Sequence, residues 1–81
     1  MNTATKLLEA MRRNPQDWRI EQLQTVARRN DLGVRCEGGS HHVFSHPKVT
    51  EVVSVPAYRP IKPIYIRQFV ALCDKVKELE S

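Results

Sequence analysis

Residues 33–46 read GVRCEGGSHHVFSH and hold the clearest local pattern of the chain. Val34 and Cys36 alternate with Arg35 and Glu37, which is typical of a half-buried strand. Gly38-Gly39-Ser40 predicts a tight turn, and residues 41–46 predict the returning strand of a hairpin. On that strand one face carries His41, Val43 and Ser45, and the other carries His42, Phe44 and His46.

A third strand and three helices complete the expected order of elements. Thr50–Val55 predicts a strand with a nearly continuous apolar run that Pro56 closes. Helices are expected over Thr3–Arg13, capped by Thr3 or Thr5, over about Asp17–Asn30, and from Pro63 to about Leu79. Their apolar stripes are Leu7, Leu8 and Met11; Ile20, Leu23, Val26 and Ala27; and Phe69, Leu72, Val76 and Leu79.

The order α-α-β-β-β-α indicates an α+β fold, with a three-stranded antiparallel sheet and helices on one face. This outline matches that of a double-stranded-RNA-binding domain. The length of 81 residues allows a single domain, 1–81. Thirteen Lys/Arg against nine Asp/Glu give a net charge of +4, which favours a polyanionic partner such as nucleic acid.

The chain shows neither a membrane pattern nor a disulfide-rich pattern. No apolar run approaches the roughly 18 residues of a membrane span, and the N-terminus lacks the pattern of a signal peptide. The two cysteines, Cys36 and Cys73, do not follow a zinc-binding spacing. We therefore expect a cytoplasmic protein with two free thiols, and a Cys36–Cys73 disulfide is the alternative.

All three histidines of the chain lie in residues 41–46. Histidine exchanges protons near neutral pH, and the glycines before His41 leave room for a phosphate to approach. The plainer interpretation is an ordinary hairpin turn, with His42 or His46 as a hydrogen-bonded, partly buried residue. A metal site is not expected, because two imidazoles fall on one strand face and one on the other.

Four basic residues follow the hairpin, and Glu51 is the single acidic residue among positions 48–67. They are Lys48, Arg59, Lys62 and Arg67. On an RNA-binding surface these side chains would contact phosphates, together with Gly39 and Ser40 of the turn. An ordinary solvated surface is the alternative.

Several of these segments, taken in order, resemble the HicA family of toxin ribonucleases. They are Gly39-Ser40-His41-His42-Val43-Phe44, His46-Pro47, Val55-Pro56 and Ile61-Lys62-Pro63, and the resemblance runs from about Ile20 to Val76. It implies a cytoplasmic toxin with a double-stranded-RNA-binding-like fold that cleaves single-stranded messenger RNA. It further implies no metal or small-molecule cofactor, and neutralisation by a HicB-type antitoxin protein. The family's catalytic histidine follows Gly-Ser and corresponds to His41.

The chain departs from the family at three places. Family members usually begin at the helix that here starts near Asp17, so residues 1–16 form an added helix before a core of residues 17–79. Ala57-Tyr58 follows Val55-Pro56 where a histidine is frequent, and Ile64-Tyr65 replaces a usual Gly-Thr. His41 is retained, while the expected substrate contacts near the last helix change.

In RNA cleavage without a metal, the 2′-hydroxyl attacks the adjacent phosphorus. The reaction needs a proton acceptor for that hydroxyl, a proton donor for the leaving oxygen, and positive charge near the phosphate. His41 supplies one proton-transfer group, and the other is left open among Tyr58, Lys62, His46 and water. Two further functions remain as alternatives. One is a non-catalytic RNA-binding module that uses Lys48, Arg59 and Lys62. The other is a protein-interaction domain whose basic face meets an acidic partner.

Overall fold

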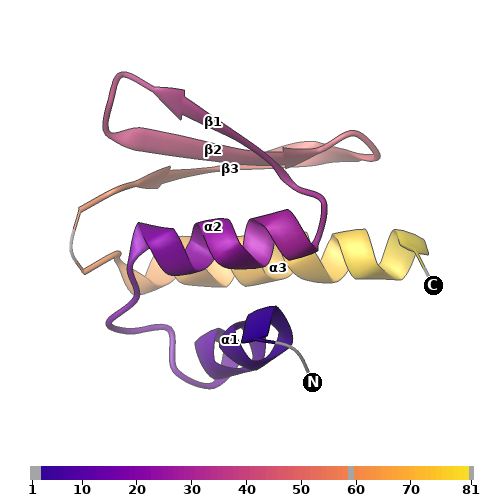
Figure 1. Cartoon of the computed structure of the whole chain (residues 1–81), viewed down its shortest axis with the longest axis horizontal. Helices are drawn as coiled ribbons and strands as arrows, with labels where there is room; N and C mark the ends of the chain where they lie inside the picture. Colours follow the sequence, from indigo (N-terminus) through magenta and orange to yellow (C-terminus); the bar gives the residue numbers. More distant parts are fainter. Residues whose placement is uncertain (1–2, 59, 81) are drawn as a thin grey trace.

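The computed structural model describes residues 3–58 and 60–80. Six elements follow one another along the chain, as Figure 1 shows: α1 (Thr3–Arg13), α2 (Ile20–Arg29), β1 (Gly33–Glu37), β2 (His41–His46), β3 (Val49–Pro56) and α3 (Pro63–Glu80). The strands form one antiparallel sheet in the order β1-β2-β3. The predicted element order, α+β class and antiparallel sheet are confirmed.

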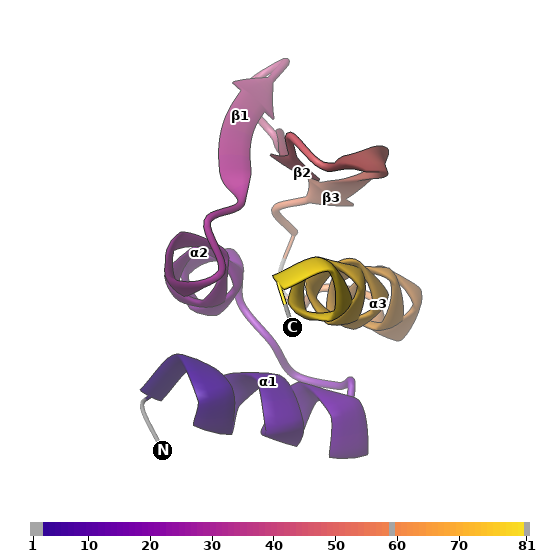
Figure 2. The ribbon, with the colours of Figure 1, turned by 90° about the vertical axis from the view of Figure 1, so that its right-hand side faces the viewer.

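The elements stack in three layers. Helices α2 and α3 lie side by side under one face of the sheet, and α1 packs beneath both of them on the side away from the sheet (Figure 2). None of the described elements covers the opposite face of the sheet. The outer face therefore has no helix over it, although Val43 on that face is only 9% exposed, whereas Phe44 and Val55 on the inner face are fully buried.

The core lies between the layers and is built from the apolar stripes. Phe44 on β2 packs edge-to-face against Phe69 on α3, with ring centroids 5.0 Å apart. Helix α1 adds Leu8 and Met11, each 1% exposed, to the same buried cluster as α2 and α3. The predicted stripes are thus largely confirmed. Leu79 is the exception: it is 51% exposed, in the last turn of α3.

An ion pair also ties α1 to α3. The Arg12 guanidinium donates to both carboxylate oxygens of Asp74, at 2.8 and 2.7 Å. This hydrogen bonding lowers the pKa of Asp74 below its usual value, although partial burial opposes the shift. Because both side chains stay about two-fifths exposed, the pair adds only modestly to stability.

Helix α2 begins at Ile20, three residues later than predicted. Asp17 has φ 66°, a left-handed conformation that a helix cannot include. The backbone N–H of Arg19 donates to Gln22 Oε1 at 3.0 Å and satisfies one group at the helix start. At the first helix, Thr5 lies inside α1 rather than at its cap, because α1 starts at Thr3.

The prediction of a half-buried β1 is wrong, since all five of its residues are exposed. β1 is an edge strand, and Figure 2 shows it curving away from α2 toward the turn. Its inner-face side chains therefore lose the helix cover that β2 and β3 keep, and Val34 is 39% exposed.

Both cysteines are free, Cys36 on exposed β1 and Cys73 in the core. The alternative of a Cys36–Cys73 disulfide is therefore wrong. Burial raises the pKa of the Cys73 thiol to about 12. In the part of the chain that the structure describes, no helix combines the length and apolar character that crossing a membrane requires.

Candidate functional site

The glycine turn between β1 and β2 leaves an open approach to the sheet. Gly38 and Gly39 have φ values of 63° and 76°, which side chains rarely adopt, and no atom lies within 4 Å of a Cβ added at either position. Glycine is therefore required by the backbone and not by crowding. The turn is anchored to the end of β3, because Ala57 N–H donates to the Ser40 carbonyl at 2.7 Å.

His41 begins β2 at the mouth of this turn, and its side chain is exposed. It pairs with Glu37 on β1 and Pro56 on β3, on the outer face of the sheet. The Ser40 hydroxyl lies 3.3 Å from His41 Nδ1, within hydrogen-bonding distance. A ring engaged through Nδ1 has Nε2 as its second donor or acceptor atom.

The other two histidines occupy different environments. His42 lies on the inner face beside Val55, is 9% exposed, and its buried Nδ1 has no hydrogen-bond partner within the described chain. His46 is partly buried, and its Nδ1 accepts the Lys48 N–H at 3.1 Å. The expected hydrogen-bonded, partly buried histidine is therefore His46. The predicted face alternation holds to Phe44, after which the register shifts.

The structure separates the basic residues that the sequence grouped together. Lys48 lies in the β2–β3 turn, beyond the far end of β2 from His41. The strand from His41 to His46 spans about 16 Å at about 3.3 Å per residue. His46 lies at that far end too, so it is a poor partner for His41. Arg67 is exposed in the second turn of α3, within the helix layer. Arg59 lies outside the described residues.

Two of the proposed partners of His41 lie at its own end of the sheet. Tyr58 and Lys62 follow Pro56, the β3 residue paired with His41, and both are exposed. With Pro56, Pro60, Ile61 and Tyr65 they line a hollow of about 160 Å³. Of the predicted contact residues within the described chain, Gly39, Ser40 and Lys62 thus share an end of the molecule with His41.

Sequence reasoning assigned no role to Glu37 and Arg35, which lie beside His41. Glu37 is the direct cross-strand neighbour of His41, and its Oε1 is 2.6 Å from an Arg35 guanidinium nitrogen. The length of the turn could have predicted this pairing. If residues 38–40 form the turn, position 37 must face position 41 on the neighbouring strand. Strand register therefore brings a carboxylate and a guanidinium to the candidate site.

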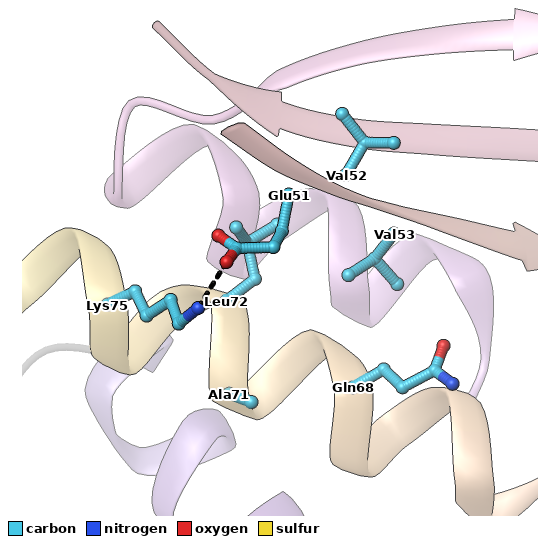
Figure 3. Close-up of a pocket in the computed structure, with 7 residues that line it drawn as sticks. All are labelled: Glu51, Val52, Val53, Gln68, Ala71, Leu72 and Lys75. Carbon is cyan, nitrogen blue, oxygen red and sulfur yellow. Dashed lines mark hydrogen bonds and ion pairs between the residues drawn. The ribbon is translucent and has the colours of Figure 1, made fainter. Parts of the chain in front are cut away.

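A second hollow, of about 320 Å³, lies between β3 and α3 (Figure 3). Across it Lys75 Nζ donates to Glu51 Oε1 at 2.5 Å, which lowers the pKa of Glu51. The remaining lining side chains are Val52, Val53, Gln68, Ala71 and Leu72. This hollow opens along the β3 edge and contains no histidine, so it is separate from the His41 site.

Within residues 3–58 and 60–80, no three His, Cys, Asp or Glu side chains gather in a way that could hold a metal ion. Comparisons of the chain with protein-family models, curated proteins and solved structures give no match.

Proposed function

We propose that this chain is a HicA-type toxin, a metal-independent endoribonuclease that cleaves messenger RNA in the cytoplasm through His41. The observation that carries the proposal is the placement of His41. An exposed imidazole stands at the mouth of a double-glycine turn, on the sheet face that no described element covers. A phosphate can approach such a turn closely because no side chain intervenes.

The residues around His41 suit RNA cleavage. The Ser40 hydroxyl, 3.3 Å from Nδ1, orients the ring so that Nε2 faces the substrate. Lys62 lies at the same end of the sheet and supplies positive charge for the RNA backbone. Lys48, at the far end, is better placed to hold a neighbouring stretch of the strand than the scissile phosphate.

The fold proposed with this function is that of a double-stranded-RNA-binding domain, here preceded by helix α1. In this proposal a HicB-type antitoxin neutralises the toxin by covering the outer sheet face around His41. The net charge of +4 favours an acidic partner surface at that interface. A complex in which His41 remained open to RNA would contradict direct occlusion.

The test compares wild-type protein with His41→Ala and His46→Gln on a defined single-stranded RNA in excess EDTA. We expect fragments from the wild type and from His46→Gln, because His46 lies at the other end of β2. His41→Ala should lose cleavage and keep RNA binding. Intact RNA with all three proteins, with binding retained, would instead favour the non-catalytic RNA-binding module.

A further inference from the structure

Cleavage through His41 leaves one proton transfer unassigned. The 2′-oxygen that attacks and the 5′-oxygen that leaves lie on opposite sides of the phosphorus, so two separate groups must serve them. Of the two cross-strand neighbours of His41 in the described sheet, Pro56 has no proton to exchange, whereas Glu37 carries a carboxylate. The helices pack against the other face of the sheet and contribute no group here.

Building on the proposed function, we infer that Glu37 is the general base of the reaction, His41 is the general acid, and Arg35 binds the scissile phosphate. Directly opposed residues on antiparallel strands have Cβ atoms about 4.5–5.5 Å apart on the same face. Both side chains are open to solvent, with Glu37 52% exposed. The two groups can therefore flank one ribose-phosphate unit laid on the outer face.

Arg35 adds a positive charge beside the proposed pair of Glu37 and His41. It stands two residues before Glu37 on the same face of β1, and it is 73% exposed. Its guanidinium places a positive charge 2.6 Å from Glu37 Oε1. An exposed pair of this kind is worth at most about 1 kcal/mol, so an incoming phosphate can displace it. Arg35 then neutralises the phosphate, and Glu37 is released toward the 2′-hydroxyl.

The step balances without any further reactant. The 2′-hydroxyl proton passes to the Glu37 carboxylate, and the 2′-oxygen forms a bond to phosphorus. The bond from phosphorus to the 5′-oxygen breaks, and that oxygen takes a proton from the His41 imidazolium. The products are a 2′,3′-cyclic phosphate and a 5′-hydroxyl, and both side chains regain their protonation states from water.

The test uses two versions of an RNA whose cleavage position has been mapped with the wild-type protein. One has the natural 5′-oxygen at that position, and the other has a bridging sulfur, which leaves without a general acid. The variants are Glu37→Gln, His41→Ala and the matched control Glu51→Gln, whose carboxylate lies on the inner side of the sheet beside Lys75.

We expect Glu37→Gln to lose about 10²–10⁴-fold in the rate of cleavage on both substrates, as removal of a general base should. His41→Ala should show an equally large loss of cleavage rate on the oxygen substrate. On the sulfur substrate, its cleavage rate should lie within about tenfold of the wild-type rate. Glu51→Gln should cleave both normally.

If Glu37→Gln cleaves at a rate within threefold of the wild type while His41→Ala is inactive, the role of Glu37 is overturned and the proposed function still stands. Sulfur rescue of Glu37→Gln would overturn the assignment of acid and base. Failure of the wild type to cleave, or full activity in His41→Ala, would overturn the proposed function and this inference with it.

Discussion

Replacing Leu8 with alanine should show that helix α1 is an integral part of the folded unit. Leu8 is 1% exposed and belongs to the same buried cluster as the side chains of α2 and α3. Leu→Ala at a fully buried site costs about 2–5 kcal/mol, through lost transfer energy and the cavity left behind. A domain of 81 residues has a free energy of unfolding of about 4–12 kcal/mol at 0.05–0.15 kcal/mol per residue. The substitution should therefore remove a large fraction of the stability.

Urea unfolding followed by Trp18 fluorescence measures this loss. Trp18 is the single tryptophan of the chain and stands between α1 and α2, where its Nε1 donates to the Asn14 carbonyl at 2.7 Å. With a slope near 1 kcal/mol per M, a loss of about 2–5 kcal/mol lowers the midpoint by about 2–5 M. The matched control is Leu79→Ala, at a leucine that is 51% exposed, and its effect should stay within about 0.5 kcal/mol.

A loss below about 1 kcal/mol in Leu8→Ala, with the slope unchanged, would refute this reasoning. It would mean that α1 packs loosely and that the rest of the chain folds without its contribution. A lowered slope with a small loss would indicate instead that α1 detaches before the rest of the chain unfolds.

Two further predictions concern titratable groups. Because Arg12 lowers the pKa of Asp74 below its ordinary value of 3.8, the pair stabilises the fold above about pH 4, and that stability is lost as the pH falls through the lowered pKa. Asp74→Asn should therefore cost up to about 1 kcal/mol at pH 7 and show a smaller loss between pH 5 and pH 2 than the wild type, and equal losses would contradict the role of the pair. A colorimetric thiol reagent should modify one cysteine, Cys36, in the native protein and two in urea, because burial protects Cys73 and raises its pKa to about 12. Rapid modification of both thiols in the native protein would count against this burial.

The sequence predicted the elements well because hydrophobic period and turn chemistry act locally. The helices begin and end near the predicted positions, and the hairpin turns at the two glycines. The errors arise where tertiary context decides. Nothing near Asp17 marks its left-handed backbone, and β1 alternates like a half-buried strand although it curves away from α2 and its residues are exposed.

The candidate site was predicted in part for the same reason. The local pattern singled out the glycine turn and the three histidines that follow it, and the family resemblance selected His41 among them. Lys48 and His46 are equally near in sequence, yet an extended strand carries them to the far end of the sheet. Glu37 lies close to His41 only because the register of β1 and β2 pairs the two residues. The periodicity of each strand taken alone does not predict this pairing.

His41 is exposed at the start of strand β2, and this makes the functional tests interpretable. His42 and Phe44 point to the helices and are 9% and 0% exposed, whereas His41, between Ser40 and His42, points to solvent. A substitution at a solvent-facing strand position that removes no core contact usually changes stability by no more than about 0.5 kcal/mol. If His41→Ala loses cleavage while its urea midpoint stays at the wild-type value, unfolding cannot explain the loss, and the imidazole itself must take part in the reaction.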